Sequence, residues 1–491
     1  MRLIRPAVSY IVCLALILPA YNCGRQVPLP ETPLAPVVFE PLRDSVNKSY
    51  TDLFQEAPQL EFSSTQLRQM RGYFDQAERY CVHEFKQRGR EYEREMNEKQ
   101  RELRQRSSNL DSAVRRELHC RVQHLRVLKS QTEVLALQAI PVAYENKRAK
   151  LELIEHWPSE LRGIQAEKAS GEYRKRPHSD VLDIGFRSVG EGQEGDVRLG
   201  REAVEEMRRA GLLPPEVDDP VVRSYVTNLT QKIAAHSDLR VPVQISVLNS
   251  KEINAFALPG GYLFVQRGLL EAAEDESQLA GVIAHEIAHA AARHGHKLMR
   301  RATIASIIYQ VAQVAAIMLV GPVGIGTYYA LQYGFYGLGL VLNLNLLGVS
   351  RDFELEADQL GVQYAWSAGY DPTGFIRFFD KMATREGYVN GASWFRTHPP
   401  FYQRMVKAQR EIMFLPERES LIQQSTAFME MKKNLVEVAA QAEKDEKDRP
   451  SLLRPEEDDC SPPPKLEYVP GQRIETLCSI PPPGGGAVAQ Q

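Results

Sequence analysis

The chain has 491 residues, of which 43% are hydrophobic and 25% are charged, and its formal net charge is −3. This length is enough for two or more domains, and the composition is that of an ordinary globular protein. Because acidic and basic residues nearly balance, the sequence has no basic excess with which to hold a nucleic acid. We therefore exclude nucleic acid as a partner.

The N-terminus has the layout of an export signal. Arg2 and Arg5 precede an apolar run over residues 7–20, and Cys23 follows. We interpret residues 1–23 as a signal peptide that ends in a lipidated cysteine, as in bacterial lipoproteins. The small residue usual before such a cysteine is missing, so a plain cleaved signal or an uncleaved anchor stays open. We expect export in each case, with the lipid or the N-terminal segment anchoring the chain to the membrane.

The six cysteines contain no C-x-x-C pair, which argues against a thiolate metal site. Cys460 and Cys478 share the C-terminal tail, and we expect these two to pair in an oxidising compartment. Cys81 and Cys120 lie in segments with a helical pattern, where we expect buried thiols.

Helical periodicity dominates the first third of the chain. Residues 24–60 are rich in proline and are expected to form a linker, whereas residues 61–165 follow a helical pattern. An apolar heptad seam runs through the start of this pattern and consists of Leu67, Met70, Phe74, Ala77 and Cys81. We predict a helical hairpin or coiled coil, which is either a solvated spacer or an arm that binds a protein partner.

The main globular domain is expected over residues 196–415, after a second linker at residues 166–195. Residues 241–249 alternate and are rich in β-branched side chains, which is typical of a strand. Residues 253–270 have the pattern of a strand, a tight turn, a second strand and a helix. The sequence thus predicts a small sheet directly before a long helix.

An uncharged apolar insert, residues 302–350, interrupts this domain. Two segments within it approach the length needed to cross a bilayer, although both contain glutamine, asparagine or glycine. We expect buried or membrane-resting helices, and a pair of membrane spans is the alternative. After the domain we expect a helix over residues 416–448 and a disordered, proline-rich tail over residues 449–491.

The segment GVIAHEIAHAAARHGHK carries the motif H-E-x-x-H and is expected to form a helix that ends near Gly295. On a helix, His285 and His289 lie one turn apart on the same face, where two imidazoles can hold one Zn²⁺. Glu286 then lies beside the open position of the metal. There it accepts the proton of a water that attacks a peptide carbonyl.

A third metal ligand is required, and Glu354 is the best candidate in the sequence. Glu354 and Asp358 lie one turn apart in a segment with a helical pattern. Asp358 is placed to accept a ring N–H from a ligand histidine and so to fix its tautomer. We expect Glu356 to point elsewhere on that helix, and we expect His294 to point away from the face that carries the ligands.

The motif H-E-x-x-H, followed much later by S-R-x-x-E-x-E-A-D-x-x-G, resembles the CAAX-prenyl-protease and HtpX-like zinc metallopeptidases. N-A-F-A-L-P-G-G before the helix and T-H-P-P-F-Y-Q-R after it resemble the periplasmic, BepA-like branch of that family. The resemblance covers about residues 196–410 and implies a gluzincin-type core with one zinc ion per chain. It assigns His285, His289 and Glu354 as zinc ligands and Glu286 as the catalytic glutamate.

The resemblance also implies roles for residues other than the zinc ligands and the catalytic glutamate. Asp358 matches the aspartate that closes the glutamate motif. His398 matches a histidine near the metal that gates the site or stabilises the oxyanion, and Arg404 matches its arginine partner. The strand before the helix is expected to bind substrate as an added strand. The residues assigned to substrate binding are Asn254, Ala255, Phe256, Gly260 and Gly261.

The sequence therefore predicts an α+β, mostly helical protein with a gluzincin-type core, in which an H-E-x-x-H helix and a small β-sheet follow a long helical segment. We expect a zinc metalloendopeptidase of the bacterial envelope, in the periplasm. Its expected substrates are unfolded or misassembled envelope and outer-membrane proteins. Two alternatives stay open: an envelope chaperone or binding protein with a latent metal site, and an integral membrane protease with spans in residues 302–350.

Overall fold

The computed structural model describes residues 40–105, 111–171, 189, 192–209, 213–299, 351–385 and 402–448, together with positions 460 and 478. Our expectations for Cys23, for the insert at residues 302–350 and for His398 lie outside these residues. The described chain is mostly helical with one small sheet, which confirms the predicted fold class. In this part of the chain, none of the helices is both long and apolar enough to cross a membrane.

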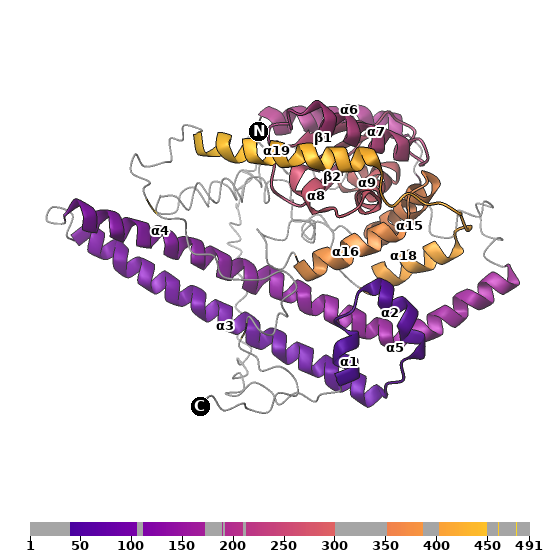
Figure 1. The fold of residues 1–491 in the computed structure, drawn as a ribbon, viewed down its shortest axis with the longest axis horizontal. Coiled ribbons are helices and arrows are strands. Elements are labelled where there is room, and N and C mark those ends of the chain that lie inside the picture. The colour runs from indigo at the N-terminus through magenta and orange to yellow at the C-terminus, as the bar shows by residue number, and fades with distance from the viewer. Residues whose placement is uncertain are drawn as a thin grey trace, which may run out of the picture.

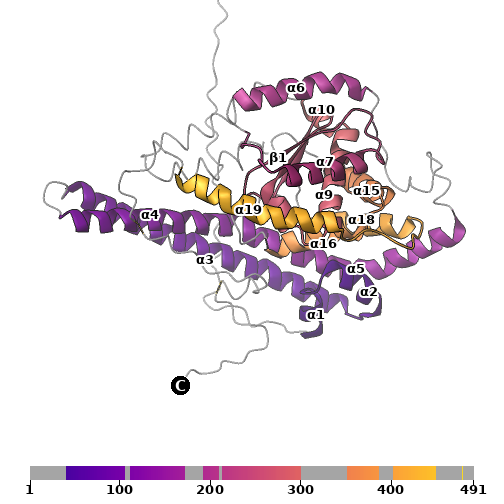
Figure 2. The ribbon, with the colours of Figure 1, turned by 45° about the horizontal axis from the view of Figure 1, so that its top comes forward.

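A long helical hairpin forms the N-terminal part of the described chain. α3 (Ser64–Gln105) and α4 (Ser112–Val134) pack against each other along their length and lie side by side in both views (Figures 1 and 2). A short π-helix (Leu135–Ala139) joins α4 to α5 (Ile140–Ser170), which packs on the first half of α3. The five residues of the predicted apolar seam are all buried, as their heptad spacing predicts.

The segment that we expected to be a linker is helical from residue 40 onward. It contains α1 (Glu40–Ser45), α2 (Tyr50–Glu56) and one 3-10 turn. The rings of Phe54 and Trp157 meet edge to face with centroids 4.7 Å apart, and the Trp157 indole N–H donates to the Phe54 carbonyl at 2.9 Å. The proline-rich composition gave no sign of these helices. They are short and are held by a few apolar side chains that pack on α5, which is a tertiary contact.

A three-stranded sheet begins the second part of the protein. Its strands are β1 (Gln244–Leu248), β2 (Ala255–Leu258) and β3 (Tyr262–Gln266), in the order β1-β3-β2. β1 is parallel to β3, and β2 is antiparallel to β3. These positions agree with the strand pattern of the sequence, and β2 lies at an edge of the sheet.

Helices cover this sheet on both sides. The described helices of this second part are α6 (Gln193–Arg209), α7 (Pro220–Ala234), α8 (Arg267–Ala272), α9 (Glu276–Ala291), α10 (His294–Met299), α15 (Arg351–Ser367), α16 (Thr373–Arg385), α18 (Tyr402–Phe414) and α19 (Thr426–Asp448). Of these, α7 packs on β1, α8 on β3, and α9 on β2 and β3. Figure 2 shows α6 at the top, the hairpin at the bottom and α9 between them. α9 packs against α15, α16 and α7, and every residue of α9 except His289 is buried.

α5 joins the hairpin to the rest of the protein. Lys150 of α5 forms a buried ion pair with Asp380 of α16 at 2.7 Å, and Arg410 of α18 donates to Glu167 at 2.6 Å. A continuous hydrophobic core extends from α3 and α5 to the helices around the sheet. The base of the hairpin is therefore part of the folded core, and only its distal half is placed to act as a solvated spacer or an arm.

Two disulfides connect the hairpin to the C-terminal tail. Cys81 of α3 is bonded to Cys478 with 5.1 Å between their Cα atoms, and Cys120 of α4 is bonded to Cys460 with 5.3 Å. Our expectation that Cys460 pairs with Cys478 was wrong, as was the expectation of free thiols in the helices. Cys460 and Cys478 are close in sequence, but each one lies against the hairpin and not against the other. The Cys478 side chain is buried in the hydrophobic core.

We predict that peptide mapping without reduction yields Cys81 linked to Cys478 and Cys120 linked to Cys460. Replacing both Cys81 and Cys478 by alanine should lower the free energy of unfolding by about 2–5 kcal/mol, because the crosslink restricts the unfolded chain. Denaturant titration of this variant and of the Cys120→Ala, Cys460→Ala variant measures the two contributions separately. A peptide that links Cys460 to Cys478 would contradict the observed pairing.

Candidate metal centre

α9 places its two histidines against α15. Its N-cap is Asp275, whose side chain accepts from the Gln278 N–H at 2.9 Å, so the helix starts at a defined residue. The backbones of α9 and α15 meet at Gly361, where a Cβ atom would lie 2.9 Å from the Cα of His285. Only a glycine permits this approach, which brings the ligand-bearing faces of both helices together.

Three side chains from α9 and α15 converge on one point. The Nε2 atoms of His285 and His289 lie 3.0 Å apart. Oxygens of Glu354 lie 3.6 Å from His285 Nε2 and 3.5 Å from His289 Nε2. A tetrahedral metal with bonds of about 2.0–2.1 Å places its ligand atoms roughly 3.3 Å apart. The three side chains therefore fit a divalent metal ion, and within the described residues they form a cluster with this geometry.

A buried charge network supports His285 from behind. Its Nδ1 lies 2.9 Å from Asp358 Oδ1, so Nδ1 carries the proton and Nε2 faces the metal cluster. Arg404 of α18 donates to both oxygens of Asp358, at 2.6 and 2.7 Å, and lies 3.2 Å from Glu354 Oε2. The side chains of Arg404, Asp358 and His285 have no exposed surface.

Burial by itself raises the pKa of Asp358, but the charge and hydrogen bonds of Arg404 and the hydrogen bond from His285 outweigh it. The pKa of Asp358 therefore lies below its ordinary value, and the carboxylate is charged when it accepts the His285 proton. Glu286 follows His285 on α9 and is buried, and its charge also acts on Arg404. The charges of Asp358, Glu354 and Glu286 thus all act on the Arg404 guanidinium next to the cluster.

His294 and Glu356 lie next to this cluster without being part of it, and the sequence did not reveal their contacts with His289 and with each other. α9 ends at Ala291, Arg293 has a left-handed φ of 57°, and α10 begins at His294. The turn brings His294 Nδ1 within 2.8 Å of His289 Nδ1, and His294 Nε2 lies 3.1 Å from Glu356 Oε2. Burial lowers the pKa of His294, which favours the neutral ring. α9 thus ends four residues before Gly295, near which we expected its end.

Most of the residues assigned to substrate binding contact other parts of the protein itself. Asn254 and Ala255 are buried, and the Phe256 ring stacks on Phe264 with centroids 4.7 Å apart. At Gly260 and Gly261 φ is +77° and +83°, and added Cβ atoms would meet the backbones of Val197 and Pro242. The close approach that we expected at the two glycines is thus to α6 and to the chain before β1. β2 itself lies at an edge of the sheet.

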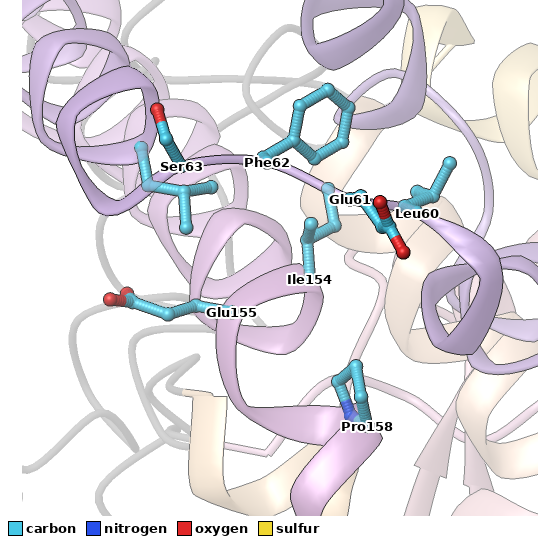
Figure 3. Close-up of a pocket in the computed structure, with 8 residues that line it drawn as sticks. Leu60, Glu61, Phe62, Ser63, Ile154, Glu155 and Pro158 are labelled. Carbon is cyan, nitrogen blue, oxygen red and sulfur yellow. The ribbon is translucent and has the colours of Figure 1, made fainter.

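A cavity of about 330 Å³ lies elsewhere, at the base of the hairpin. Figure 3 shows its walls, which come from the segment before α3, with Leu60 and Phe62, and from α5, with Ile154 and Pro158. None of its lining residues belongs to the metal cluster, so this cavity is separate from the centre described above.

Comparison with known proteins agrees with this geometry. Residues 220–412 match the model of peptidase family M48. The beta-barrel assembly-enhancing protease of Yersinia pestis is 27% identical over 263 residues, which cover 52% of each chain. That of Escherichia coli (strain K12) is 26% identical over 239 residues, which cover 48% of this chain and 47% of the relative. The mitochondrial metalloendopeptidase OMA1 of Schizosaccharomyces pombe is 31% identical over 209 residues, which cover 42% of this chain and 57% of the relative.

The fold and the cluster define the class of the second part as a metallopeptidase domain with a gluzincin-type core. The match to peptidase family M48 extends over residues 220–412, and the cluster lies inside this match. The chain spans about half the length of the curated relatives that it matches.

We predict that Asp358→Ala destabilises the protein by about 3–5 kcal/mol, because it leaves the Arg404 guanidinium buried without its bidentate partner. Denaturant titration in the presence of a chelator measures this, so that loss of a metal does not contribute. The matched control is Asp352→Ala on the exposed face of the same helix, with an expected change below about 1 kcal/mol. Equal effects of the two substitutions would show that the buried pair is not stabilising.

Proposed function

We propose that this chain is a zinc-dependent metalloendopeptidase. The observation that carries the proposal is the cluster of His285, His289 and Glu354, with distances of 3.0–3.6 Å between donor atoms. Two imidazoles and one carboxylate are a ligand set typical of catalytic zinc, since they leave a fourth position open. His289 is the one residue of α9 that is not fully buried, so its side of the cluster is the more exposed one.

Each residue of the centre has a definite task in peptide hydrolysis. Zinc, when bound, supplies the Lewis acid that lets water attack a carbonyl at neutral pH. Glu286 accepts the proton of the attacking water and returns it to the leaving amine. Asp358 holds the ring of His285, and Arg404 holds Asp358 while it lies 3.2 Å from Glu354.

The substrate extends the sheet at β2. The Gln266 N–H donates to the Asn254 carbonyl at 3.0 Å, and Phe256 lies opposite Phe264. Because bonded and non-bonded pairs alternate along an antiparallel ladder, the backbone groups of Ala255 and Ala257 point to the open edge of the sheet. An extended peptide that pairs with this edge is recognised through its backbone, which favours unfolded segments over folded domains.

The biological substrates, in this proposal, are unfolded or misassembled proteins of the bacterial envelope. Two disulfides favour an oxidising compartment, in agreement with the export signal expected in residues 1–23. Several relatives are named as beta-barrel assembly-enhancing proteases. The chain acts in the periplasm, where Cys23 or the N-terminal segment anchors it to the membrane and the distal hairpin is available to a protein partner.

We predict that Glu286→Gln keeps one zinc ion per chain but reduces cleavage of casein by at least about 10²-fold, because the general base is lost. Zinc content and cleavage are measured on the same purified residues 24–491. The control Glu274→Gln changes an exposed carboxylate just before α9 and should retain activity. Zinc in the wild type without cleavage would contradict the proposed activity and favour a latent or binding protein.

We predict that Ala257→Pro lowers kcat/KM for an extended peptide by roughly 3–10-fold, because one N–H at the open edge is lost. Zinc content should not change, since proline is tolerated in an edge strand where the N–H faces outward. Phe256→Pro is the contrasting variant, because it removes an N–H that pairs with β3 and should destabilise the sheet. An unchanged kcat/KM in Ala257→Pro would exclude pairing of substrate at this edge.

A further inference from the structure

We propose that His294 and Glu356 are positioning residues for the metal ligand His289, and this inference rests on the proposed zinc centre. The three side chains form a chain of contacts that leads away from the metal cluster. His289 Nδ1 lies 2.8 Å from His294 Nδ1, and His294 Nε2 lies 3.1 Å from Glu356 Oε2. Neither His294 nor Glu356 is itself a ligand in this arrangement.

The contacts determine which nitrogen carries each proton. An ionised carboxylate only accepts hydrogen bonds, so the Nε2 of His294 that faces Glu356 is the donor. In a neutral ring the other nitrogen of His294 is then an acceptor, and it can only receive the Nδ1 proton of His289. This leaves the Nε2 lone pair of His289 facing His285 and Glu354, as a metal ligand requires.

The ring of His294 is held on several sides. His294 is 1% exposed and Glu356 is 5% exposed, so water competes little for their contacts. Phe353 of α15 stacks on the His294 ring with centroids 4.4 Å apart and an angle of 11°. Glu356 and Phe353 both belong to α15, the helix that also carries the ligand Glu354. The helix that supplies the carboxylate ligand therefore also fixes the orientation of His289, through His294.

The turn that presents His294 is fixed from α6. Asp196 accepts two hydrogen bonds from the Arg293 guanidinium, at 2.6 and 2.7 Å, and also lies 2.7 Å from His296 Nδ1. Arg293 holds the left-handed φ of 57° that ends α9, a conformation that is costly for a residue with a side chain. The bidentate pair offsets this cost and holds His294 under His289.

The two histidine ligands thus differ in their support. His285 is backed directly by a carboxylate, Asp358, which is paired with Arg404. His289 is backed by a neutral imidazole that relays to Glu356. A ring in this position fixes the tautomer of the ligand without placing a full negative charge next to the more exposed side of the cluster.

The test is the zinc affinity of purified residues 24–491, measured by competition with a chromogenic chelator. We expect His294→Leu to weaken zinc binding by about 10–100-fold, as is typical when a partner of a ligand histidine is removed. His294→Asn keeps an acceptor near the Nδ1 position and should lose less than about 5-fold. The matched control is His236→Leu, which changes an exposed histidine at the end of α7 and should bind zinc as the wild type does.

The absorption spectrum of the cobalt-substituted protein provides the second readout, because it reports the ligand geometry and does not depend on activity. We expect His294→Leu to shift the visible bands and His294→Asn to restore them. Wild-type zinc affinity and an unchanged spectrum in His294→Leu would overturn the inference while leaving the proposed function intact. Absence of zinc from the wild type would instead overturn both.

Chelator-treated variants are unfolded in denaturant to separate metal affinity from folding. If His294→Leu does not fold, Glu356→Ala decides, because its change lies one residue further from the ligand. Loss of Glu356 removes the preference for a proton on His294 Nε2, and we expect zinc to bind several-fold more weakly. Wild-type affinity in Glu356→Ala would overturn the relay.

Discussion

The buried guanidinium of Arg404 is the constraint around which the metal centre is organised. A charge without exposed surface is tolerated only when it is paired and hydrogen-bonded, and Asp358 provides both contacts. Because Arg404 belongs to α18, Asp358 to α15 and His285 to α9, the pair fixes three helices relative to one another. α18 also packs on α5, so the same helix connects the metal centre to the base of the hairpin.

Two features of the backbone give the cluster its geometry. Gly361 allows α9 and α15 to touch, so that Glu354 reaches two histidines on the neighbouring helix. The early end of α9 then turns the chain at Arg293, which returns His294 to a ring that it would otherwise face away from. Both features depend on contacts with other elements, since α15 approaches at the glycine and Asp196 of α6 pairs with Arg293.

The hairpin is tied to the helices around the sheet and to two positions of the C-terminal tail. The continuous core, the ion pair of Lys150 with Asp380 and the two disulfides all tie segments that are distant in sequence. The two disulfides suit a protein that works in an oxidising compartment, as we propose for the periplasm. The distal end of α3 and α4 lies away from α9, the helix that carries His285 and His289 (Figure 2).

Local spacing was sufficient to place His285 with His289 on one face of α9, and Glu354 with Asp358 on one face of α15. Four-residue steps share a helix face whatever the surroundings. The strands around the Gly260 turn and the buried seam of α3 followed from periodicity for the same reason. The cysteine pairing was predicted wrongly, and the contacts of Glu354 with the two histidines and of His294 with His289 also depend on which elements meet in space. The disulfides join cysteines 397 and 340 residues apart, and the end of α9 is set by Arg293, which pairs with Asp196 of α6. Neither feature produces a local pattern in the sequence. Only tertiary packing decided them.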